Sequence, residues 1–271
     1  MHEDAFTPVV LAIGGSDTSA GAGIQADLKT IHAHGAYAAT VVTAVTSQNT
    51  QGVQASFPVP EAVLLDQLES VLRDLHIGSV KLGMVPQKES ARIIANTLAS
   101  RPSLPLVVDP VMGSTSGFSL AEPDPVSELC ELLAPQATVI TPNIPEAELL
   151  LSRSISTCDE AAEAAVALRS RWGCAVLLKG GHLPEGEDPV DFLADSDGEE
   201  RLIGFRLEVS HSHGTGCCLS SAIASQLALG AGLRFAVKEA KDFVARALLY
   251  PVVTGSQPSA FDPFCGRLVE D

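Results

Sequence analysis

Short β-branched runs alternate with longer amphipathic segments along most of the chain, and this alternation constrains the fold more than any other feature. The β-branched runs predict strands over residues 9–13, 40–45, 79–82, 106–108, 138–141 and 175–179. The amphipathic segments predict helices over residues 24–34, 60–75, 87–100, 124–133, 145–151 and 159–171. Since alternating strands and helices form parallel sheets with both faces covered, we predict a three-layer α/β fold with a mostly parallel central sheet and helices on both faces.

The pattern changes after residue 179. Segments 189–194 and 201–209 flank Asp195-Ser196-Asp197-Gly198, whose Asp and Gly residues favour a hairpin turn. Two further helices are predicted over 215–229 and 235–250. No repeat, low-complexity tract or linker separates these segments, so we expect residues 1–271 to form a single domain.

A net charge of −16 limits the partners of such a chain. A surface of this sign repels nucleic acid and anionic membranes, and no cluster of Lys and Arg offsets it, so we expect no nucleic-acid and no membrane partner. The N-terminal residues lack the basic region of a signal peptide, and the most apolar stretch, 36–45, is too short to span a bilayer. The six cysteines form no C-x-x-C pair, which indicates reduced thiols and a cytoplasmic protein.

The loop after the first predicted strand is rich in glycine, and such loops bind ligands in open parallel sheets. Its Gly21-x-Gly23-x-x-Ala26 segment fits a variant of the dinucleotide fingerprint, but no acidic residue occurs between Asp27 and Glu61 to bind a ribose. This argues against NAD and leaves either a ligand-binding loop or a turn with only a packing role. The absence of any Gly-Lys dipeptide excludes a Walker-type ATPase, and the absence of a G-x-S-x-G segment argues against an α/β hydrolase.

The segment Gly214-Thr215-Gly216-Cys217 leads directly into a predicted helix and is the strongest local motif. Two glycines around a threonine let the backbone direct its N–H groups to one side, and the positive end of the helix dipole adds to them, so we predict an anion hole for phosphate. In the first turn of this helix we expect the pKa of the Cys217 thiol to fall below its usual value. Two alternatives remain open: a glycine-loosened helix start with an inert cysteine, and a metal site formed by His211, His213, Cys217 and Cys218.

Seven segments of the chain carry a joint resemblance to one family, and they are Gly15–Thr30, Thr46–Val53, Lys81–Met84, Val108–Met112, Thr141–Ala147, Leu178–His182 and His213–Cys217. In this order they resemble the hydroxymethylpyrimidine/phosphomethylpyrimidine kinases of thiamine biosynthesis, which belong to the ribokinase-like superfamily. The resemblance implies a ribokinase-like fold and an ATP-dependent kinase that phosphorylates 4-amino-5-hydroxymethyl-2-methylpyrimidine and then its monophosphate to the diphosphate. It also implies ATP and Mg²⁺ as cofactors and a homodimer.

The resemblance assigns substrate binding to Gly15, Asp27 and Gln48, with Met84 and Val111 packing against the pyrimidine ring. A carboxamide at Gln48 suits this role, because it offers a donor and an acceptor to an exocyclic amine and a ring nitrogen. The substrate end of the site is therefore expected near the first two predicted strands.

The resemblance assigns a second group of residues to phosphoryl transfer. Asn143 and Glu146 would place Mg²⁺ and the ATP phosphates, Asp109 and Glu146 would lie at the metal, Lys179, Gly214, Thr215 and Gly216 would contact the phosphates, and Cys217 would accept the proton of the hydroxymethyl group. Simpler interpretations stay open for two of them. Glu146 could serve only the dipole of its helix, and Lys179 could be a solvated strand end.

Three features depart from the family pattern. Ala20 stands where a glycine is usual, Cys218 stands where threonine is common, and residues 254–258 lack a Gly-His-Gly segment. Two other functions remain open: a pyridoxine or pyridoxal kinase of the same superfamily, and a non-catalytic nucleotide or metabolite sensor. A sensor is expected to have lost Cys217 or its flanking glycines, and this chain has both.

Overall fold

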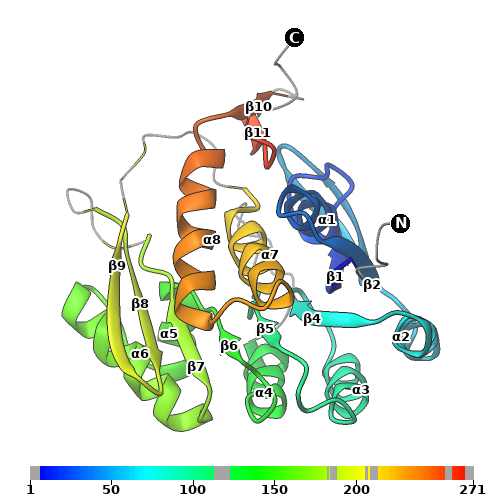
Figure 1. The fold of residues 1–271 in the computed structure, drawn as a ribbon, viewed down its shortest axis with the longest axis horizontal. Coiled ribbons are helices and arrows are strands. Elements are labelled where there is room, and N and C mark those ends of the chain that lie inside the picture. Colours follow the sequence, from blue (N-terminus) through cyan, green and yellow to red (C-terminus); the bar gives the residue numbers. More distant parts are fainter. Residues whose placement is uncertain are drawn as a thin grey trace, which may run out of the picture.

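A nine-stranded sheet forms the centre of the protein (Figure 1). The structure is a computed structural model, and it describes residues 7–112, 123–181, 183, 188–204, 207, 213–253 and 258–265. The strands are β1 Val9–Ser16, β2 Tyr37–Asn49, β3 Gly52–Pro58, β4 Ile77–Leu82, β5 Leu106–Val108, β6 Val139–Ile140, β7 Ala175–Leu178, β8 Val190–Asp195 and β9 Gly198–Ile203. Their spatial order is β3-β2-β1-β4-β5-β6-β7-β8-β9. Neighbours from β2 to β7 pair in parallel, and β3, β8 and β9 join through antiparallel pairs. A separate hairpin consists of β10 Pro251–Val253 and β11 Pro258–Phe261.

Helices cover both faces of this sheet (Figure 1). They are α1 Gly23–Ala33, α2 Glu61–Asp74, α3 Lys88–Leu98, α4 Pro123–Leu133, α5 Ile144–Leu151, α6 Cys158–Trp172, α7 Thr215–Ala228 and α8 Leu233–Ala247. Alternate residues of β1 serve two cores: Leu11 packs with α2 to α6, whereas Val10 packs with α1, α7 and α8. The predicted three-layer α/β fold is therefore confirmed.

The order in which successive strands are added to the sheet reverses at β1. It passes from β1 to β2 on one side and then continues with β4 on the other side of β1. Ligands of open α/β sheets bind where strand order reverses, outside the carboxyl ends of the strands. This point of the fold lies beside the Gly-rich loop that follows β1.

The predicted helices and parallel strands are all present, with bounds that differ by a few residues. The predicted hairpin is confirmed, because Asp195 pairs with Gly198 across a two-residue turn. Strands β3, β10 and β11 were not predicted. For β3 the reason is its mixed polarity, because this edge strand has no continuous apolar run. Part of the predicted strand 201–209 lies outside the described residues. Among the described helices, none is long and apolar enough to cross a membrane.

Candidate active site

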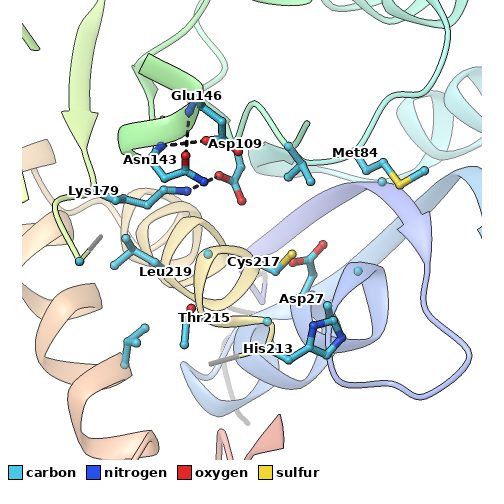
Figure 2. Close-up of a pocket in the computed structure, with 18 of the residues that line it drawn as sticks. Asp27, Met84, Asp109, Asn143, Glu146, Lys179, His213, Thr215, Cys217 and Leu219 are labelled. Atoms are coloured by element: carbon cyan, nitrogen blue, oxygen red, sulfur yellow. Dashed lines mark hydrogen bonds and ion pairs between the residues drawn. The ribbon is translucent and has the colours of Figure 1, made fainter. Parts of the chain in front are cut away.

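A cavity of about 900 Å³ opens at the carboxyl edge of the sheet. It contains every site residue predicted from the sequence: Gly15, Asp27, Gln48, Met84, Asp109, Val111, Asn143, Glu146, Lys179, Gly214, Thr215, Gly216 and Cys217. Figure 2 shows Lys179, Asp109 and Glu146 on one side and Met84 on the other, with Cys217 between them. The fold thus brings both predicted residue groups, one for substrate and one for phosphate, into one cavity.

The start of α7 forms the floor of the phosphate end. Gly214 precedes the helix with a φ of 86°, and a Cβ at this position would lie 2.0 Å from the carbonyl oxygen of Gly21, so only glycine fits. A Cβ on Gly216 would lie 3.4 Å from Lys179 Nζ, which places this first turn beside the lysine. No side chain among the described residues caps α7, and the first N–H groups of a helix have no partner within it. The geometry therefore fits the predicted anion hole.

Asp109 and Lys179 form a charged pair at the same end. Lys179 Nζ lies 2.7 Å from Asp109 Oδ1, and the Thr141 hydroxyl donates to the same oxygen at 3.2 Å. Burial raises the pKa of Asp109, but Lys179 and Lys81 outweigh it, so the net pKa is lowered and the carboxylate stays ionised. The Lys179 side chain is only 16% exposed, which is inconsistent with a solvated strand end.

Asn143 and Glu146 form a capping box at the N-terminus of α5. Asn143 Oδ1 accepts from the Glu146 N–H at 2.9 Å, and Glu146 Oε2 accepts from the Asn143 N–H at 2.8 Å. Burial raises the pKa of Glu146 to about 7, with Lys179 opposing this shift and Asp109 adding to it. The Glu146 carboxyl group therefore caps its helix and also lines the cavity, and its role at a metal stays a prediction.

The predicted substrate residues Gly15, Met84 and Gln48 line the same cavity. A Cβ on Gly15 would lie 2.9 Å from Met84 Sδ, so the glycine leaves room for the thioether. Gln48 Nε2 lies 3.0 Å from His213 Nε2, and the same ring nitrogen lies 3.2 Å from Asp17 Oδ2. Gln48, Asp17 and His213 therefore join the first loop, β2 and the residue before the anion hole into one polar network.

Two residues of this network, Asp17 and His213, received no substrate role in the sequence interpretation. Their positions in the sequence could have indicated a place in the site, because Asp17 directly follows β1 and His213 directly precedes Gly214. Ala20, which replaces a usual glycine in the same first loop, has a φ of 60°. This left-handed conformation favours glycine, which explains the family preference at that position.

Asp27 lies in the cavity wall and is fully buried. Both of its carboxylate oxygens lie 2.8 Å from Lys81 Nζ, and the Ser221 hydroxyl donates to Oδ1 at 2.8 Å. Burial opposes the charge of Lys81, but Asp27, Cys217 and Asp109 together outweigh this effect, so the lysine pKa is raised. Lys81 also lines the cavity. It belongs to the segment Lys81–Met84, but no role was predicted for it from the sequence.

Cys217 is the third residue of α7 and is half-buried at the cavity wall. The expectation of a lowered thiol pKa is wrong for this structure, because burial raises the pKa of Cys217 to about 11 against the opposing effect of Lys81. Enclosure by the cavity wall therefore outweighs the effects of Lys81 and the Gly23 N–H, which favour the thiolate. For the alternative metal site, His211 lies outside the described residues, and the described ones contain no group of three or more His, Cys, Asp and Glu suited to a metal.

Comparison with known proteins points to one family. The family model for phosphomethylpyrimidine kinase matches residues 17–261. A hydroxymethylpyrimidine/phosphomethylpyrimidine kinase of Rhizobium meliloti (strain 1021) is 46% identical over 90% of this chain and 91% of its own length. The thiamine biosynthetic bifunctional enzyme TH1, chloroplastic, of Arabidopsis thaliana is 46% identical over 96% of this chain, and the chain spans only 50% of that longer relative.

Solved structures share the fold. The ADP complex of Bacillus subtilis pyridoxal kinase has a TM-score of 0.88 and 32% identity, covering 97% of this chain and 100% of that chain. Phosphomethylpyrimidine kinase from Clostridium difficile 630 has a TM-score of 0.77 and 40% identity, covering 89% of this chain and 99% of that chain. These likenesses confirm the ribokinase-like fold. The match over residues 17–261 and the seven ordered motifs lead to the same conclusion: the chain belongs to the phosphomethylpyrimidine kinase family.

Proposed function

We propose that this chain transfers the γ-phosphoryl group of ATP to the hydroxymethyl group of 4-amino-5-hydroxymethyl-2-methylpyrimidine and then phosphorylates the monophosphate, as a step of thiamine biosynthesis. One observation carries the proposal: a single cavity joins the uncapped start of α7 and Lys179 to a pocket formed by Gln48 and Met84. Relatives that are 40–46% identical and carry this activity in their names support it.

The phosphate end supplies the charge that the reaction requires. Phosphoryl transfer proceeds through a loose transition state with charge spread over the phosphoryl oxygens, so positioning and electrostatics matter most. Backbone N–H groups of Gly214 to Cys217 and the ammonium group of Lys179 would stabilise that charge. They also offset the general repulsion between ATP and a chain of net charge −16.

Cys217 is the proposed proton acceptor for the first transfer. Its thiolate takes the proton of the hydroxymethyl group, the substrate oxygen bonds to the γ-phosphorus, and the bond to the ADP oxygen breaks with its electron pair leaving on ADP. Because the thiol pKa is about 11, this role requires stabilisation of the thiolate inside the cavity.

The carboxylates of Asp109 and Glu146 fit a magnesium ion at the phosphate end. Both are buried and offer hard oxygen ligands, but one oxygen of each already binds Lys179 or the Asn143 N–H. Such a pair suits an ion held chiefly by phosphates and water with one or two protein carboxylates. When bound, Mg²⁺ would neutralise charge on the ATP phosphates.

The substrate end favours a small aminopyrimidine. The Gln48 carboxamide can pair with a ring nitrogen and an exocyclic amine, while Met84 and Val111 line the same cavity and would pack against the ring. A pyridoxal kinase remains the second candidate, because the Bacillus subtilis enzyme has the same fold with a TM-score of 0.88. Its lower identity of 32%, against 46% for the Rhizobium meliloti kinase, supports the pyrimidine.

The decisive experiment measures ADP release with MgATP and four acceptors: the hydroxymethylpyrimidine, its monophosphate, pyridoxine and pyridoxal. We expect turnover of both pyrimidines and loss of both activities in Lys179→Met, with wild-type rates in Lys238→Met, an exposed lysine on α8. Rapid turnover of pyridoxal without turnover of either pyrimidine would favour the second candidate. Absence of ADP release with all four acceptors would favour a sensor.

We also propose a cytoplasmic homodimer. All six cysteines are free, which suits a reducing compartment. Val45 and Phe57 are paired across β2 and β3 at the sheet edge and are 50% and 62% exposed, an apolar edge that a second copy would cover. Sedimentation of wild type and Phe57→Lys tests this assembly, with a monomeric wild type as the contrary result.

A further inference from the structure

A buried ion pair lies beneath the proposed proton acceptor and has no part in the mechanism above. Lys81 is only 1% exposed, and its Nζ lies 2.8 Å from both oxygens of the fully buried Asp27. Buried ion pairs cost so much desolvation that apolar replacements are often as stable or more so. Stability alone is therefore a weak explanation for this pair, which lines the cavity beside Cys217.

The surroundings hold the ammonium group of Lys81 in one place. Asp27 comes from α1 and Lys81 from β4, while Ser221 of α7 donates to Asp27 Oδ1 at 2.8 Å. A Cβ on Gly83 would lie 2.8 Å from Lys81 Nζ, so the absence of a side chain there makes room for the ammonium group. The pair thus bridges a strand and two helices at the cavity wall.

Cys217 stands one helical turn before Ser221, so both residues face the same side of α7. Figure 2 shows the sulfur of Cys217 directed toward the carboxylate of Asp27. The thiol and the ion pair are therefore electrostatic neighbours, as their mutual effects on protonation also indicate.

Several groups around the cavity act on this thiol. Lys81 and the Gly23 N–H favour the thiolate, whereas Asp27 and Asp109 oppose it. The charge of Lys179 also interacts with the thiolate favourably. Lys81 has the largest stabilising effect on the thiolate among these groups.

We propose that Lys81 is a positioning residue for the first phosphoryl transfer: its ammonium group, fixed by Asp27, stabilises the thiolate of Cys217 that takes the proton of the substrate hydroxyl. The inference rests on the proposed function for its catalytic consequence. Its electrostatic part, the effect of Lys81 on the thiol, is independent of any substrate. The monophosphate is already largely ionised near neutral pH and needs no such base, so Lys81 serves the first transfer more than the second.

The test measures alkylation of Cys217 by neutral iodoacetamide between pH 6.5 and 10, resolved by peptide mass spectrometry, in wild type and Lys81→Gln. We expect the apparent thiol pKa to rise by about one unit in Lys81→Gln, which slows alkylation roughly tenfold at pH 8. The double variant Asp27→Asn/Lys81→Gln leaves neither charge of the pair unpaired. In it we expect the apparent pKa of the Cys217 thiol to rise as well, but by less. Alkylation of Cys158 on α6 reports on the state of the fold in each sample.

Lys241→Gln is the matched control, because Lys241 lines the same cavity but pairs with Asp191, at 2.6 Å, and not with Asp27. We expect its Cys217 alkylation profile to equal that of wild type. A Lys81→Gln profile identical to wild type, or a double variant that reacts as fast as wild type, would overturn the inference. If wild type fails to phosphorylate pyrimidines while the alkylation shift is present, the proposed function fails and the effect of Lys81 on the thiol stands.

Discussion

At the scale of single residues, the proposed role of Cys217 as a base predicts that the two phosphorylation steps differ in pH dependence. Below a thiol pKa of about 11, the thiolate fraction rises about tenfold per pH unit. We expect kcat/KM for the hydroxymethylpyrimidine to rise with pH from 7 to 9, and kcat/KM for the monophosphate to stay nearly level. Initial rates at fixed MgATP check this, and a flat profile for the first substrate would exclude the thiolate as its base.

Substitution of Cys217 separates proton transfer from construction of the anion hole. Cys217→Ala would remove the proposed base but leave the backbone N–H groups, so we expect the first step to slow by roughly 10²–10⁴-fold and the second much less. Cys158→Ala, outside the cavity, serves as the control. Equal losses in both steps would mean that Cys217 only shapes the loop, and no loss would make it an inert thiol.

Gln48 carries the prediction for substrate recognition. Gln48→Leu leaves a donor and an acceptor on the pyrimidine unpaired, at a cost of about 1–3 kcal/mol for each group, so kcat/KM for the pyrimidine should fall by roughly tenfold or more. It also removes the contact with His213. Gln54→Leu, on the exposed side of β3, is expected to keep the wild-type value. A wild-type value in Gln48→Leu would place the pyrimidine elsewhere.

At the scale of elements, two capping boxes of the same kind begin α5 and α6, and only the first lines the cavity. Removing either cap in Asn143→Ala or Thr157→Ala should lower the free energy of unfolding by about 1 kcal/mol. We expect only Asn143→Ala to raise the KM for ATP. Urea titrations and steady-state kinetics on both variants check this, and equal KM values would leave Asn143 with a structural role alone.

At the scale of the whole molecule, one apolar cluster extends across the sheet from Leu11 in β1 to Phe192 in β8. Because both halves of the chain share this core, we expect a single cooperative unfolding transition, consistent with one domain. Fluorescence of Trp172, the single tryptophan, reports on α6, whereas far-ultraviolet circular dichroism reports on every helix. Coincident urea transitions support one domain, and separated transitions would show two.

Local sequence patterns determined the layers, the helices and the location of the site. Apolar periodicity distinguishes strand from helix, and parallel strands place their following loops at one edge, so the ligand loops could be predicted together. Gly214 and Gly216 indicated an anion hole because glycine spacing before a helix is itself a local property. The amphipathic segment 145–151 likewise predicted α5, whereas the capping box of Asn143 and Glu146 at its start was not predicted.

Only the tertiary structure decided which polar groups meet and how strongly burial acts on them. Lys81 and Asp27 are 54 residues apart, and Gln48 and His213 are 165 residues apart, so no local pattern connects them. The pKa of Cys217 depends on a balance between Lys81 and the Gly23 N–H, which favour the thiolate, and desolvation by the cavity wall, and this balance exists only after packing. Charge placement over long sequence separations and loss of solvent are properties of the packed molecule, and they determine whether this thiol can act as a base.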